Sequence, residues 1–99
     1  MMKNNINDFD DVPAGQSISY EHLMFYLEEG REIEFIYQGK EYFISNSSEG
    51  RAIWMGKTRG SDYFGVMNKE FTEAAKIDGI TLKQLFQDEN SKVKITTIF

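Results

Sequence analysis

The chain has 99 residues, of which 40% are hydrophobic and 27% are charged, and it carries a net charge of −5 and no cysteine. This length predicts a single domain, since one hydrophobic core commonly serves about 100–150 residues. The absence of cysteine excludes disulfide scaffolds, zinc ribbons and thiol chemistry, and the acidic balance argues against binding through nucleic-acid phosphates. No run of about 18 apolar residues occurs, so we expect no membrane span and a cytoplasmic protein.

The first 16 residues are polar, with several Asn and Asp residues and only isolated apolar side chains. This composition predicts a flexible N-terminal tail over residues 1–16 and a single domain over residues 17–99. Asp8, Asp10 and Asp11 lie in the predicted tail. They lack the central glycine and distal glutamate of an EF-hand loop, so we interpret them as solvated acids and expect no bound metal.

The first predicted helix begins after Ser19, whose hydroxyl can accept a hydrogen bond from a free amide of the first turn. Apolar side chains then recur at the spacing of one buried helical face: Tyr20, Leu23, Met24 and Leu27. Gly30 ends the helix, because glycine adopts the left-handed conformation without a Cβ clash. His22 falls in the first turn, where we expect it at the surface or near the cap.

Residues 32–45 have the pattern of an antiparallel hairpin. Gln38 and Gly39 supply a two-residue turn, since a type I′ turn needs positive φ at both central positions. This turn places Phe35 opposite Tyr42 on the face that we expect in the core. Alternation leaves five residues on the other face: Glu32, Glu34, Ile36, Glu41 and Phe43.

A third strand is predicted over residues 51–57, followed by a loop over residues 56–62, which contain two glycines and a Ser-Asp pair. The side chain of Asn68 can cap a second helix that extends to about residue 76.

Two more elements complete the predicted domain. Thr81 and Gln84 have the spacing of a capping box for a short helix, and the β-branched residues of Val93–Phe99 predict a final strand. The order is therefore α-β-β-β-α-α-β. We predict an α+β fold in which the hairpin, the third strand and the C-terminal strand form a small antiparallel sheet, with helices packed mainly on one face.

Two stretches of the chain resemble a known family. The first starts at Ile18 and contains the Ser-capped helix, then Glu-Glu-Gly-Arg-Glu-Ile-Glu-Phe, Gly-Lys-Glu-Tyr and Asn-Ser-Ser-Glu-Gly. The second, Lys76 to Phe86, reads Lys-Ile-Asp-Gly-Ile-Thr-Leu-Lys-Gln-Leu-Phe. Together they cover roughly half the chain and resemble a family of small uncharacterised cytoplasmic proteins of Gram-positive bacteria and their phages. The resemblance implies a small bacterial α+β protein and no particular activity.

The residues do not supply the parts of a catalytic site. His22 is the only histidine and has no cysteine or second histidine to work with as a base or a metal ligand. The glutamates of the hairpin are expected on a hydrated face, where carboxylates keep ordinary acidity. We therefore expect no enzyme and no cofactor.

The outer side of the hairpin is the favoured candidate for binding. Ile36 and Phe43 are large apolar side chains among Glu32, Glu34 and Glu41, a pattern typical of a small interaction patch. Either this face is open, or a helix or the tail covers it as a second core layer. If it is open, the preferred partner is a basic protein with an apolar knob. The first hypothesis is thus a non-catalytic module that binds and modulates another protein.

Three alternatives stay open. The acidic stretch Glu28–Glu41 could act as a nucleic-acid mimic, in an inhibitor of anti-defence or immunity type. Nucleic acid could instead bind directly, through one basic window with an aromatic residue: Arg51, Trp54, Lys57 and Arg59. The last strand, Val93–Phe99, could add a strand from a second copy and form a homodimer if it lies at a sheet edge.

Overall fold

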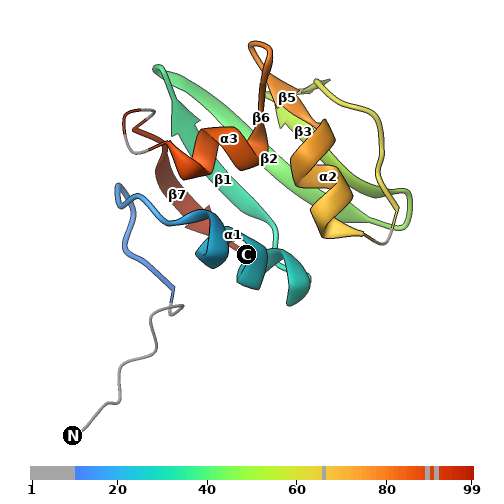
Figure 1. Ribbon diagram of the computed structural model, residues 1–99, viewed down its shortest axis with the longest axis horizontal. Coiled ribbons are helices and arrows are strands. Elements are labelled where there is room, and N and C mark those ends of the chain that lie inside the picture. Colours follow the sequence, from blue (N-terminus) through green and yellow to red (C-terminus); the bar gives the residue numbers. More distant parts are fainter. Residues whose placement is uncertain (1–10, 66, 89, 91) are drawn as a thin grey trace, which may run out of the picture.

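The computed structural model describes residues 11–65, 67–88, 90 and 92–99. Within them the elements in chain order are α1 (Tyr20–Glu28), β1 (Ile33–Tyr37), β2 (Lys40–Ser47), β3 (Gly50–Met55), β4 (Thr58–Arg59), α2 (Asn68–Ala74), β5 (Lys76–Ile77), β6 (Ile80–Thr81), α3 (Leu82–Gln87) and β7 (Lys94–Ile98). These residues form a five-stranded antiparallel sheet with the order β4-β3-β2-β1-β7, and a separate two-stranded sheet of β5 and β6. The helices lie on one side of the large sheet (Figure 1). The predicted α+β fold is confirmed.

The hairpin of β1 and β2 has the predicted turn and register. Gln38 and Gly39 have φ values of 52° and 75°, as a type I′ turn requires. Phe35 lies opposite Tyr42, and their rings stack with centroids 5.6 Å apart. The turn therefore sets which side chains of both strands point toward the helices.

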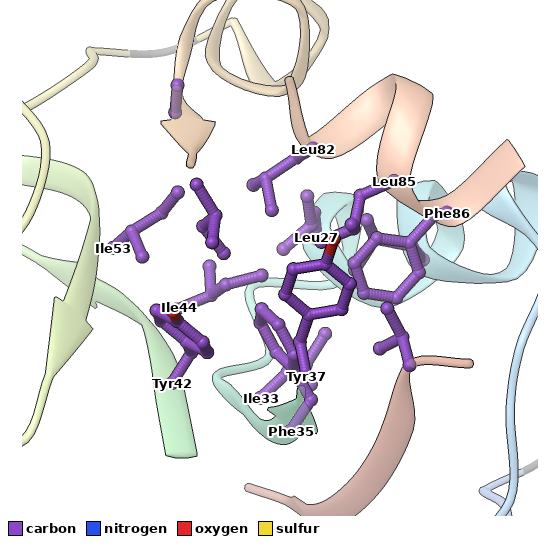
Figure 2. Packing of buried hydrophobic residues seen from close by; sticks show 14 of the residues in the cluster. Leu27, Ile33, Phe35, Tyr37, Tyr42, Ile44, Ile53, Leu82, Leu85 and Phe86 are labelled. Atoms are coloured by element: carbon purple, nitrogen blue, oxygen red, sulfur yellow. The ribbon is translucent and has the colours of Figure 1, made fainter. Parts of the chain in front are cut away.

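The hydrophobic core lies between the helices and one face of the large sheet, which we call the inner face. Figure 2 shows the side chains of this cluster pointing toward one another from the strands and from α1 and α3. Phe35 of β1 is fully buried and meets the ring of Phe86 of α3 edge-on at 5.5 Å. The opposite face of the sheet, which we call the outer face, carries the alternate residues of the same strands.

Helix α1 buries a stripe that is rotated from the predicted one. Leu23 and Leu27 are buried as predicted, but the stripe is completed by His22 and Tyr26, whose rings lie 4.6 Å apart. His22, expected at the surface or near the cap, lies next to the cap residue Ser19 but is buried. The surface position is wrong because both stripes have helical spacing and only the packing against the sheet selects between them.

Two of the three predicted helix starts are confirmed. Ser19 accepts a hydrogen bond from the amide of His22 at 3.0 Å, and Thr81 forms the capping box with Gln84. The prediction that Asn68 caps α2 is wrong. Met67 holds the cap position without a side-chain hydrogen bond, and Asn68 is the first residue of the helix.

The structure adds three two-residue strands that the sequence analysis did not predict. β4 lies within the predicted loop over residues 56–62, where it pairs with β3. β5 and β6 flank the turn of Asp78 and Gly79, which have φ values of 52° and 80°. Since β5 begins at Lys76, α2 ends earlier than predicted.

Gly15 and Gln16, expected to be part of a flexible tail, pair with β7 at an edge of the large sheet. The amide of Gly15 donates to the carbonyl of Ile95 at 2.7 Å, and the amide of Ile95 donates to the carbonyl of Gln16 at 2.8 Å. The carboxylate of Asp11 accepts two hydrogen bonds from Arg31, at 2.9 and 3.1 Å. The rest of the predicted tail, with Asp8 and Asp10, lies outside the described residues.

Candidate functional site: the outer face of the sheet

The outer face is open within the described part of the chain, since α1, α2 and α3 all pack on the inner face. Strand pairing aligns one residue from each strand into a row across this face, which we call the central row. From β4 to β7 the central row reads Arg59, Trp54, Phe43, Glu34 and Thr97. A cation, two aromatic rings, a carboxylate and a hydroxyl thus lie side by side.

Large apolar side chains gather at the middle of the outer face. Phe43 is partly exposed and meets the ring of Phe99 edge-on at 5.9 Å, and Phe99 is 57% exposed. The indole nitrogen of Trp54 donates to the hydroxyl of Ser45 at 3.0 Å, which holds the ring against the sheet. We call Ile36, Phe43, Trp54 and Phe99 the apolar patch.

A hollow of about 420 Å³ opens beside the apolar patch and is lined in part by Glu34, Glu41, Phe43, Thr97 and Phe99. Its aromatic walls are flanked by two carboxylates, so the hollow suits a group that is apolar along its length and carries a hydrogen-bond donor or a positive charge at one end.

The structure brings four of the five predicted site residues together on the outer face. Glu34 and Ile36 of β1 lie opposite Phe43 and Glu41 of β2, respectively. Glu32 is engaged elsewhere, because its carboxylate accepts a hydrogen bond from the amide of Asn46 at 2.8 Å, at the end of the β1–β2 ladder. That these residues bind a partner stays a prediction.

Phe99 and Trp54 belong to the same face but were not assigned to it from the sequence. Alternation along the final strand could not place Phe99, because the pairing of β1 with β7 shifts register between Glu34 and Phe35. Trp54 lies opposite Phe43, a pairing that depends on the length of the turn between β2 and β3.

The basic window proposed for nucleic acid is divided by the structure. Arg51 is 3% exposed and donates to the carbonyls of Leu27 and Arg31, at 2.7 Å each, and to the side chain of Asn68 at 3.2 Å. Burial lowers the pKa of the Arg51 guanidinium from its ordinary value. It is therefore a structural group at the end of α1, and it is not accessible to a phosphate.

The other members of that window lie in the β3–β4 hairpin, where Trp54 is partly buried and Lys57 and Arg59 are exposed. Lys57 lies in the turn, and the guanidinium of Arg59 lies 4.3 Å from the centroid of the Tyr63 ring. The acidic stretch Glu28–Glu41 is likewise divided: Glu28 lies in α1 and is exposed, while Glu34 and Glu41 lie on the sheet.

The final strand lies at an edge of the large sheet, as the homodimer alternative requires. Gly15 and Gln16 occupy this edge at Ile95, which leaves less of β7 for strand addition. At the other side of the sheet, β4 and Phe64 pair with β3, and Phe64 and Arg51 exchange two backbone hydrogen bonds of 2.8 Å.

Among residues 11–65, 67–88, 90 and 92–99, no group of three or more His, Asp and Glu side chains could hold a metal ion. No helix in the described part of the chain is long and apolar enough to cross a membrane. Comparison with protein families, with curated protein sequences and with solved structures gave no match.

Proposed function

We propose that the chain is a non-catalytic interaction module of a bacterial or phage cytoplasm, which binds and modulates another protein through the outer face. The observation that carries this proposal is the apolar patch at the centre of a sheet face to which no described helix packs. Scattered apolar residues are common on protein surfaces, whereas several large apolar side chains gathered on one sheet face are typical of a binding site.

The charges beside the patch indicate the partner's chemistry. Glu34 and Glu41 lie next to Phe43 and Ile36 in the sheet, and the whole chain has a net charge of −5. A basic partner with an apolar side chain would place that side chain in the hollow. Exposed ion pairs contribute less than about 1 kcal/mol each, so the carboxylates speed association more than they tighten the complex.

The two nucleic-acid alternatives have less support. Arg51 is buried and cannot contact nucleic acid, so direct binding of nucleic acid would depend on Trp54, Lys57 and Arg59 alone among the proposed residues. A mimic of nucleic acid needs a continuous row of carboxylates, whereas Glu28 and Glu34 lie on a helix and on the sheet, respectively. The interaction module therefore remains the function that we propose.

The test is a pull-down from cell extract with the tagged chain, with and without nuclease, comparing the wild type with Phe43→Glu. A matched control is Met67→Glu, since Met67 is 53% exposed and precedes α2, away from the outer face. We expect a protein that survives nuclease, is retained by Met67→Glu and is lost with Phe43→Glu. Recovery of nucleic acid, or of the same protein with Phe43→Glu, would overturn the proposal.

The fold of the variant must be checked separately. Phe43 is only partly buried, so its replacement by Ser is expected to lower the free energy of unfolding by less than about 2 kcal/mol. A larger loss would show that Phe43 is a core residue and that the outer face is covered.

A further inference from the structure

Across strands β1 to β4 the outer face carries opposite charges on its two halves, while the exposed cation Lys94 lies opposite Ile36 on β7, outside these four strands. Lys57 and Arg59 lie on the β3–β4 half and are exposed, whereas Glu34 and Glu41 lie on the β1–β2 half. Trp54 and Phe43, which are opposite each other on β3 and β2, stand between the halves, so the aromatic part of the central row separates the cations from the carboxylates.

We propose that the outer face also binds a second copy of this chain, in a dimer whose two-fold axis runs parallel to the strands between β2 and β3. Such an axis places β2 of one copy over β3 of the other, and β1 of one copy over β4 of the other. It does not shift residues along the strand direction, so residues of one row face residues of the same row. Trp54 then faces Phe43 of the second copy, and Arg59 faces Glu34 of the second copy. The face is therefore self-complementary: an aromatic ring meets an aromatic ring, and a cation meets a carboxylate.

The next row along the strands fits the same arrangement. Extending the register of Phe43 with Trp54 places Glu41 level with Gly56, which adjoins Lys57 in the β3–β4 turn. The two-fold axis therefore sets Glu41 against the turn of the second copy that carries Lys57. Each of these contacts occurs twice in an isologous dimer, so the cationic half of each copy meets the acidic half of the other.

The size of the contact sets its strength. Strands β1, β2, β3 and β4 have 5, 8, 6 and 2 residues, and at about 4.8 Å between strands and about 3.3 Å per residue they present roughly 330 Å² per copy. Interfaces below about 1,200 Å² in total are typical of transient complexes, so we expect a dissociation constant of about 10–500 μM. The net charge of −5 on each copy opposes association, and salt at about 0.15 M screens this repulsion beyond about 8 Å.

This inference goes beyond the proposed function, because it needs no other protein. The two interactions use the same face, so the dimer would withhold the apolar patch from other surfaces until a tighter partner displaces the second copy. A chain that proves monomeric would still leave the pull-down result intact, and the two proposals can fail independently.

The test is sedimentation equilibrium of the full chain at concentrations up to about 1 mM and about 0.15 M salt. We expect a dimer, and we expect Arg59→Glu and Glu34→Arg each to weaken it about ten-fold or more, because each places like charges opposite one another. The double variant Arg59→Glu/Glu34→Arg restores the opposite charges in exchanged positions and should recover the wild-type constant within about three-fold. Lys69→Glu, a change of an exposed cation in α2 on the inner side of the sheet, serves as the control and should leave the constant unchanged.

Three results would overturn the inference: a wild type that is monomeric throughout, single variants that dimerise as the wild type does, or a double variant with native circular dichroism that fails to recover. A dimer formed through the β7 edge would give the second result, since neither Arg59 nor Glu34 lies on that strand.

Discussion

The buried guanidinium of Arg51 offers the sharpest test of what stabilises the fold, and Arg51→Met is the change that isolates it. Met keeps most of the side-chain length and removes the charge and the donors. The carbonyls of Leu27 and Arg31, each bonded to Arg51 at 2.7 Å, then lose this donor, while the amide of Gly30 still donates to the Leu27 carbonyl at 3.0 Å. A buried arginine is expensive to desolvate, but its removal takes a charged donor away from both carbonyls.

The magnitude follows from those two bonds. Hydrogen bonds from a charged donor contribute about 1.5–3 kcal/mol each, so losing the pair costs about 3–6 kcal/mol. Burial of the apolar Met side chain offsets about 1–2 kcal/mol of this loss. We expect a net loss of about 3 kcal/mol in the free energy of unfolding. For a domain of this size that corresponds to a fall of about 12–24 °C in Tm.

The assay is urea unfolding followed by far-ultraviolet circular dichroism and by the fluorescence of Trp54, the single tryptophan. Arg59→Met is the matched control, since Arg59 is exposed and its contact with the Tyr63 ring is expected to contribute less than about 1 kcal/mol. If Arg51→Met lost less than about 1 kcal/mol, the cost of burying the guanidinium would equal the gain from its bonds, and the reasoning would be refuted.

Two further changes test other parts of the structure. Gly39→Val should lower the free energy of unfolding by about 2 kcal/mol or more, because a β-branched residue resists the φ of 75° at this position; unchanged melting would disprove the turn. The hydrogen bonds from Arg31 hold the pKa of Asp11 below its ordinary value of 3.8, so the carboxylate stabilises the fold above that value and stops doing so as the pH falls through its lower folded-state pKa. Asp11→Asn should therefore lower the free energy of unfolding at pH 7 by up to about 1 kcal/mol, after allowance for the 58% exposure of the Asp11 side chain. In urea unfolding, the difference between the variant and the wild type should be smaller below pH 3.8 than at pH 7. A difference that stays constant would rule out the ion pair.

The features that the sequence predicts well are those whose chemistry is local. The turn at Gln38 and Gly39 needs positive φ at two adjacent positions, and the capping box of Thr81 needs one partner three residues away. Once the turn is placed, the faces of β1 and β2 follow from alternation alone. The sequence alone therefore predicts that Glu34, Ile36, Glu41 and Phe43 share one face.

The features that escaped prediction depend on contacts between distant parts of the chain. Asn68 resembles a helix cap, yet its side chain accepts a hydrogen bond from Arg51, 17 residues earlier. Residues 15 and 16 have no strand-like pattern, and they lie beside β7 because their backbone groups form hydrogen bonds with Ile95. The position of Phe99 depends on the register shift between β1 and β7, and no alternation rule carries through such a shift.

The pairing of backbone groups at both edges of the large sheet affects how this protein can assemble. Gly15 and Gln16 bond to β7 at Ile95, and β4 and Phe64 bond to β3, so the backbone groups at these positions are already paired. Fibril growth by stacking of strands needs long unpaired edges and becomes harder when they are interrupted. A copy that met another through the outer face, as we propose, would pair side chains and no backbone groups, so the contact would not template the next copy.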